Sequence, residues 1–169
     1  MKKKSDGFTL LELLIVLALT GIIMSIVISM FMKGNKVFAN SNTKTTLQMD
    51  AKDIQEKISD ICMQANSIDY VKGNVENDEI TELVLKLDQN GNEAYIKLNN
   101  NKLNINGFNI PSNVRSIKIN KEIVDEAYKK NSDLYKFVSI NFNIELQGKR
   151  PFGDDVIYPV KFTVTFRNR

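Results

Sequence analysis

The feature that most constrains this chain is an apolar run of 25 residues, from Phe8 to Met32, with a single charged side chain, Glu12. As a helix it would be about 37 Å long, enough to cross a hydrocarbon core of about 30 Å. It is too long for the apolar region of an ordinary secretory signal, and no small-residue cleavage site follows it. The lysines at Lys2, Lys3 and Lys4 precede the run, so the positive-inside rule predicts a cytoplasmic N-terminus and a C-terminal part outside.

Glu12 is the unusual residue of this run. A carboxylate inside an apolar span costs roughly 2.5–3.5 kcal/mol on insertion scales. Such a residue is by default a functional candidate that needs a partner. The alternative is that Glu12 lies near enough to the end of the span to reach water.

The segment from Gly7 to Glu12 reads Gly-Phe-Thr-Leu-Leu-Glu behind a short Lys-rich leader. It resembles the prepilin peptidase signal of type IV pilins and type II secretion pseudopilins, and the resemblance includes Gly21. It implies a cut between Gly7 and Phe8, N-methylation of Phe8, and a Glu12 that neutralises the N-terminal amine of a neighbouring subunit. The partners it implies are other pilin or pseudopilin subunits, prepilin peptidase, an inner-membrane assembly platform and the membrane.

Electrostatics supports this resemblance independently. Cleavage before Phe8 creates a positive amine about one helical turn from Glu12. Each charge is costly in lipid alone, and a pair lowers the cost. Pairing between subunits would let assembly itself relieve the penalty, and it would fix the axial offset between neighbours.

The chain departs from the family pattern at one place in the span. Many major pilins have a proline near its middle, whereas the corresponding residue here is Ser29 and the helical region has no proline. We therefore expect a less interrupted helix and favour a minor pilin over a major one.

After Lys33–Lys36, which marks the outer interface, the pattern stays helical and amphipathic to residue 70. Apolar residues recur at alternating spacings of four and three, which predicts one buried stripe. We expect this stripe to pack on the chain's own sheet; a coiled-coil seam to a partner is the alternative. Cys62 borders the stripe and is expected to be a small core or boundary residue. The stripe comprises Leu47, Ala51, Ile54, Ile58, Ile61, Ala65 and Ile68.

Beyond residue 70 the apolar period becomes two, which predicts strands. The segments Leu83–Leu87 and Ala94–Leu98 flank Asn90-Gly91, and a type I′ turn there would pair Leu85 with Ile96 and Leu83 with Leu98. A bulge or bend is expected at Gly107 within Lys102–Ile110. Further predicted elements are strands at Val114–Asn120, Val138–Leu146 and Val160–Phe166, with Pro159 at the start of the last, a short helix around Ile123–Lys130, and a loop over Gln147–Val156.

These patterns predict an α+β fold, in which a long N-terminal transmembrane and stem helix packs on an antiparallel β-sheet head. This is also the pilin architecture. The head, over roughly residues 80–169, more loosely resembles those of W- and J-type minor pilins and pseudopilins. The expected divisions are a cleaved leader at 1–7, a transmembrane and assembly helix at 8–32, its amphipathic continuation at 33–70, and an extracytoplasmic β-rich head at 71–169.

Composition excludes several function classes. The chain has no histidine and one cysteine, which removes His-based catalysis, zinc sites and disulfides. Its net charge is +3 and falls to +1 without the first seven residues, so nothing calls for nucleic acid. We expect no enzyme activity and no cofactor. Asp154 and Asp155 are only weak candidates for a metal, and Asp88–Glu93 lacks the spacing of an EF-hand loop.

The expected function is that of a minor pilin or pseudopilin, inserted in the cytoplasmic membrane and then built into a cell-surface filament, at its tip or as an assembly initiator. One alternative is a pilin of a competence or adhesion filament that binds DNA or another ligand. The other is a single-pass anchored domain that never polymerises. The machines that use such a subunit are the type IV pilus, the type II secretion system and the competence pseudopilus.

Overall fold

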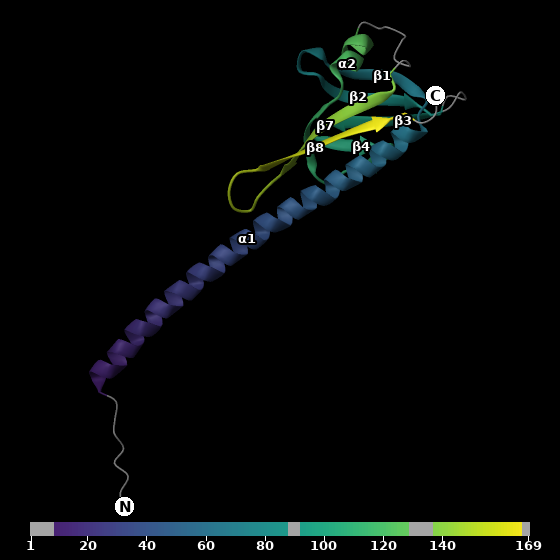
Figure 1. Cartoon of the computed structure of the whole chain (residues 1–169). Helices are drawn as coiled ribbons and strands as arrows, with labels where there is room; N and C mark the ends of the chain where they lie inside the picture. The colour runs from purple at the N-terminus through teal and green to yellow at the C-terminus, as the bar shows by residue number, and fades with distance from the viewer. Residues whose placement is uncertain (1–8, 88–91, 129–136, 167–169) are drawn as a thin grey trace, which may run out of the picture.

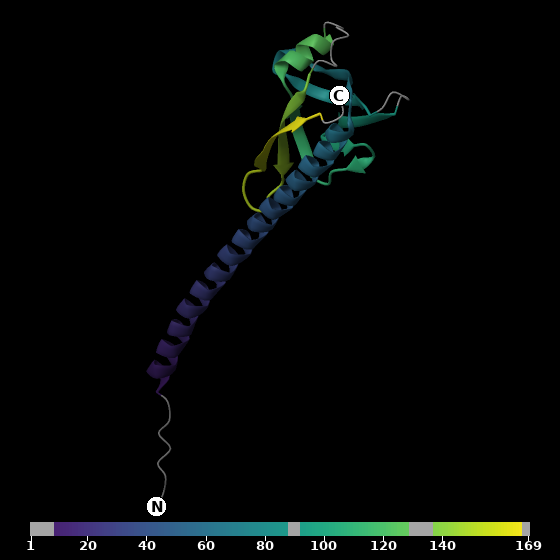
Figure 2. The same ribbon diagram turned by 45° about the vertical axis from the view of Figure 1, so that its right-hand side comes forward.

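The computed structural model describes residues 9–87, 92–128 and 137–166. It consists of one long helix, α1 (Leu10–Gln64), and a β-sheet head that packs on the C-terminal half of that helix (Figure 1). The N-terminal half of α1 extends away from the head, as Figure 2 also shows. This arrangement confirms the predicted α+β, helix-on-sheet architecture.

Helix α1 has 55 residues, so it is about 82 Å long. No proline interrupts it, and the glycines Gly21 and Gly34 lie in open space. Every described side chain from Thr9 to Phe38 is exposed, and the first buried residue is Leu47. The free part of the helix, Leu10 to Phe38, therefore spans about 44 Å.

The buried stripe of α1 packs on the chain's own sheet, as expected. Helix α1 contacts β7 (Ser139–Gly148), β8 (Val156–Thr165) and β4 (Lys102–Ile105). Within the stripe Ile61 is only partly buried, whereas Cys62 is fully buried. The thiol therefore lies in the core rather than at its border.

The expected continuation of the helix to residue 70 is wrong. Ala65 is the C-cap and has an extended backbone, and Ser67–Asn74 form strand β1. The backbone N–H of Asn66 donates to the carbonyl of Lys86, 2.8 Å away, at the point where β1 starts to pair with β2 (Glu79–Lys86). Ile68 lies on β1 but is buried like the residues of the stripe. Its spacing of three residues from Ala65 therefore resembled a continuation of the helical pattern.

The head is an antiparallel sheet in which the strands lie in the order β5-β4-β3-β2-β6-β7-β8, and β1 also pairs with β2. Strands β2 and β6 pair through a single residue pair, Glu79 with Lys118. Strand β8 is at one edge, which explains how it accommodates Pro159 in its interior. The remaining elements are the 3₁₀ helix η1 (Val75–Asn77), β3 (Glu93–Asn99), β5 (Phe108–Asn109), β6 (Asn113–Lys118) and α2 (Lys121–Tyr128).

The β2–β3 hairpin forms, but its register differs from the prediction by two residues. Leu85 pairs with Ala94 and Leu83 with Ile96. The Leu87 N–H donates to the Asn92 carbonyl at 2.8 Å, so the described part of the hairpin extends to these two residues, and residues 88–91 join them. Asn90 and Gly91 themselves lie outside the described residues.

Two-residue turns occur further along the chain. Asn100 and Asn101 have φ of 48° and 61° and join Asn99 to Lys102. Asn106 and Gly107 have φ of 48° and 92° and join Ile105 to Phe108. Positive φ at both central residues is the requirement of a type I′ turn. The bend expected at Gly107 is therefore a complete chain reversal.

One face of the sheet and the buried stripe of α1 form the core, while α2 packs on β1 and η1. Two polar contacts tie α1 to loops of the head. The Asp50 carboxylate, on a residue that is 5% exposed, accepts from the backbone N–H of Ser112 at 2.9 Å. The Thr43 hydroxyl lies 3.4 Å from the carbonyl of Lys149. The sheet residues of the core include Leu83, Leu85, Ile96, Leu103, Ile105, Ile140, Phe142, Ile144 and Leu146.

Candidate functional site

The start of α1 is a capped helix terminus. Thr9 is the N-cap, with φ −75° and ψ 149°, and its hydroxyl oxygen accepts from the backbone N–H of Glu12 at 3.3 Å. Glu12 is thereby fixed in the first helical turn, where the helix dipole favours a negative charge. The sequence interpretation missed Thr9, although a threonine three residues before a glutamate is the spacing of a capping box.

The structure places Glu12 but not the other residues of the predicted processing site. Gly7, Phe8 and the lysines Lys2–Lys4 lie outside the described residues. The pairing of Glu12 with an amine at Phe8 therefore stays a prediction.

Glu12 is the only charged side chain between Leu10 and Met32. Two other polar groups of this segment bond to their own helix: the Thr20 hydroxyl donates to the carbonyls of Val16 and Leu17 at 3.0 and 2.9 Å, and the Ser25 hydroxyl donates to that of Ile22 at 3.0 Å. Among the described residues, no cation forms an ion pair with Glu12. In lipid its charge would therefore need a partner from elsewhere.

The surroundings of Glu12 have the length and polarity of a membrane span. Helix α1 contains a stretch apolar enough to cross a bilayer, and the head buries none of it. The span is followed by Lys33 and Lys36 and then by two large apolar side chains, Val37 and Phe38, which are 69% and 76% exposed.

The weaker candidate sites gain little support. Asp155 accepts a hydrogen bond from the Gln147 side chain at 2.9 Å, and Asp154 is exposed in the same loop. No group of three or more acidic or cysteine side chains fit to bind a metal occurs in the described parts of the chain. Most of the Asp88–Glu93 segment lies outside them.

Cys62 is a core thiol. Desolvation by burial raises its pKa to about 12, so the reactive thiolate is not formed near neutral pH. Because it is the only cysteine in the chain, cysteines introduced elsewhere would be the only reactive thiols in the folded protein.

Comparison with known protein families gives one match. Residues 2–28 match the family described as the prokaryotic N-terminal methylation motif. This is a prepilin-type signal, which is consistent with the type IV pilin and pseudopilin family, and it covers both the predicted processing site and Glu12. Neither the curated proteins nor the solved structures contain a match to the chain.

Proposed function

We propose that this chain is a minor pilin or pseudopilin, a structural and non-catalytic subunit of a type IV pilus-like filament. It is inserted in the cytoplasmic membrane, cut by prepilin peptidase between Gly7 and Phe8, and methylated at Phe8. It is then assembled through α1 with other subunits, at the tip of the filament or as its initiator. The observation that carries this proposal is a methylation motif at residues 2–28, on a helix whose side chains are all exposed from Thr9 to Phe38.

Glu12 is the assembly residue in this proposal. The Thr9 cap holds it in the first turn of α1, and the described chain offers it no cation. A cut before Phe8 would supply an amine about one helical turn from Glu12 along the helix axis. Pairing that amine with Glu12 of a neighbour neutralises two charges in lipid at once and sets the axial step between subunits.

Val37 and Phe38 supply a second argument for assembly. They follow Lys33 and Lys36 on the outer side of the span, and both remain exposed. Large apolar side chains beyond a membrane favour packing against another protein, because their burial stabilises a complex by roughly 25 cal/mol per Å². A neighbouring α1 of the filament would provide that surface.

The first test is the mass of the mature protein from the cells that make it. We expect a chain that begins at Phe8 and carries one added methyl group. The matched control is Gly7→Leu, which should keep residues 1–7. A wild-type protein that retains Met1, or is cut elsewhere, would overturn the proposal in favour of a tethered domain.

The second test addresses Glu12 directly. With the photocrosslinking residue p-benzoylphenylalanine in place of Val37, the chain should form crosslinked dimers with whichever subunit lies next to it in the filament. Glu12→Leu should abolish these dimers, whereas Thr20→Leu should not, because the Thr20 hydroxyl is already satisfied within its own helix. Crosslinking that is equal in both variants would refute the pairing role of Glu12.

A further inference from the structure

The head carries a hollow on the sheet face opposite α1, which we call the outer-face hollow. It has a volume of about 550 Å³, and its lining residues come from all five strands β1 to β5. That volume lies within the range of small-molecule sites. Strands β7 and β8, which make the main contacts with α1, contribute nothing to it.

Its floor is a row of three side chains on adjacent strands. Val84 pairs with Tyr70 of β1 on one side and with Tyr95 of β3 on the other. Val84 is only 4% exposed but lies apart from the core cluster, whereas the tyrosines are 42% and 38% exposed. The floor therefore consists of a buried valine with a half-exposed aromatic ring on each side.

A β-bulge places Tyr70 in this row. In a regular strand Ile68 and Tyr70 would face the same side, because side chains alternate with a period of two. The register between β1 and β2 shifts between these two residues, so Ile68 is in the core while Tyr70 lines the outer-face hollow. Bulges that re-aim a side chain are common beside functional sites.

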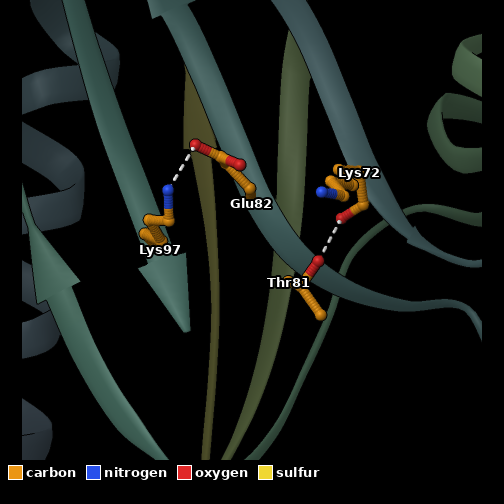
Figure 3. Close-up of polar contacts among 4 residues, drawn as sticks. All are labelled: Lys72, Thr81, Glu82 and Lys97. Atoms are coloured by element: carbon orange, nitrogen blue, oxygen red, sulfur yellow. Dashed lines mark hydrogen bonds and ion pairs between the residues drawn. The ribbon is translucent and has the colours of Figure 1, made fainter. Parts of the chain in front are cut away.

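The polar residues beside this floor carry balanced charge. Four charged residues line the hollow: Glu82, Glu93, Lys97 and Lys102. The Lys97 ammonium is 3.2 Å from the Glu82 carboxylate (Figure 3), and the Lys102 ammonium donates to the carbonyl of Pro111 at 2.6 Å. In the same view the Thr81 hydroxyl donates to the carbonyl of Lys72 at 3.2 Å, which ties β1 to β2.

Amide groups extend the polar side of the hollow. Lys97 pairs with Asn104 of β4, which in turn pairs with Asn109 of β5. The Asn104 side-chain amide donates to the Asn109 side-chain oxygen at 2.7 Å, and this hydrogen bond orients the amide groups of both residues. Amides both donate and accept hydrogen bonds, as hydroxyl-bearing ligands require.

We propose that the outer-face hollow binds an uncharged saccharide. The apolar face of a sugar ring stacks on Tyr70 or Tyr95, whose rings present flat apolar area with a polar tip. The hydroxyls of the sugar exchange hydrogen bonds with Glu82 and the asparagine amides. Balanced charge disfavours nucleic acid, which is bound mainly by excess Lys and Arg, and also disfavours anionic sugars. The site does not depend on polymerisation, and it is open in the single subunit.

The test uses the full chain as a monomer in phosphocholine micelles. Maltoside detergents are avoided because their headgroup is itself a neutral disaccharide. The neutral probes are maltose, lactose and N,N′-diacetylchitobiose, and the charged probes are sialyllactose and a single-stranded DNA. Titration is followed by NMR of backbone amides, and we expect at least one neutral probe to shift outer-face residues of β1–β5 while those of β7 and β8 do not move.

Variants then assign the binding to the aromatic row. Tyr70→Ala and Tyr95→Ala should each weaken binding at least tenfold, whereas Tyr95→Phe should retain the stacking. Phe152→Ala is the matched control, because Phe152 is a 51% exposed aromatic residue outside the hollow. Should an alanine variant fail to fold, the amide shifts of the wild-type protein decide alone. The proposal is overturned if no neutral probe shifts β1–β5 at 10 mM, if only a charged probe does, or if folded tyrosine variants bind as tightly as wild type.

Discussion

Gly148, at the end of β7, allows the sheet to approach α1 closely. A Cβ built there would lie 2.8 Å from Cδ1 of Leu47 and 2.9 Å from Cγ2 of Thr43. Carbon atoms are in favourable contact at about 3.5–4.0 Å, so the shortfall is roughly 0.6–1.2 Å. Leu47 is 1% exposed and Thr43 is held by a 3.3 Å hydrogen bond to the carbonyl of Ala39, so neither can easily move aside. We predict that Gly148→Ala lowers the free energy of unfolding by about 1–3 kcal/mol.

The assay is urea unfolding of the full chain in micelles, followed by the near-UV circular dichroism of its tyrosines, since the chain has no tryptophan. Gly34→Ala is the matched control: the same substitution on α1, with nothing within 4 Å, should not destabilise the head. In a Leu47→Ala background Gly148→Ala should cost at least about 0.5 kcal/mol less, because the nearer clashing atom is gone. An equal loss in both backgrounds, or a loss below about 0.5 kcal/mol, would refute this reasoning.

Two further predictions concern buried groups on α1. Burial raises the Cys62 pKa from 9.0 to about 12, so above pH 9 the unfolded chain ionises while the folded chain does not. The free energy of unfolding should therefore fall as pH rises, and at pH 10 the fall should be about 1.4 kcal/mol larger than in Cys62→Ala. Urea titrations that show equal pH dependence of the two proteins would contradict this prediction. Asp50→Ala should cost about 1–3 kcal/mol, because the N–H of Ser112 loses its acceptor. Asp50→Asn keeps a side-chain oxygen that can accept from the Ser112 N–H, so it should be more stable than Asp50→Ala. If Asp50→Asn has the lower urea midpoint of the two, this hydrogen bond is not the reason for the loss.

The sequence predicted the long helix, its buried stripe and the antiparallel head, because each depends on a simple periodicity. The register of the β2–β3 hairpin could not be read in the same way. A shift of two residues leaves Leu83, Leu85, Ala94 and Ile96 on the same face, so the apolar pattern fits both registers equally well. The two registers differ in where the turn between the strands is centred, which the apolar pattern does not determine.

The turns illustrate the same limit. The sequence contains Asn-Gly at 90–91 and again at 106–107, and both satisfy the residue preference of a type I′ turn. The second forms a two-residue reversal, across which Ile105 and Phe108 pair, whereas the first lies outside the described residues and the pairing of Leu85 with Ala94 is not centred on it. Local preference allows the turn, and strand pairing decides where it is used.

The candidate sites were predictable to different degrees. Glu12 stands out because a charge is rare in an apolar run, and Thr9 could have been found from its spacing to Glu12. The outer-face hollow could not, because Tyr70 reaches it through a bulge that reverses the alternation of β1. A single extra residue in a strand leaves no periodic signal.

The continuity of α1 has a mechanical consequence. The residues that would lie in lipid and those that hold the sheet belong to one rod with no hinge between them. A torque or pull applied at the N-terminal end of α1 would be transmitted to the head along one continuous helix. The orientation of the sheet face that bears Tyr70 and Tyr95 would then depend on how the N-terminal end of α1 is held, some 80 Å away along the helix.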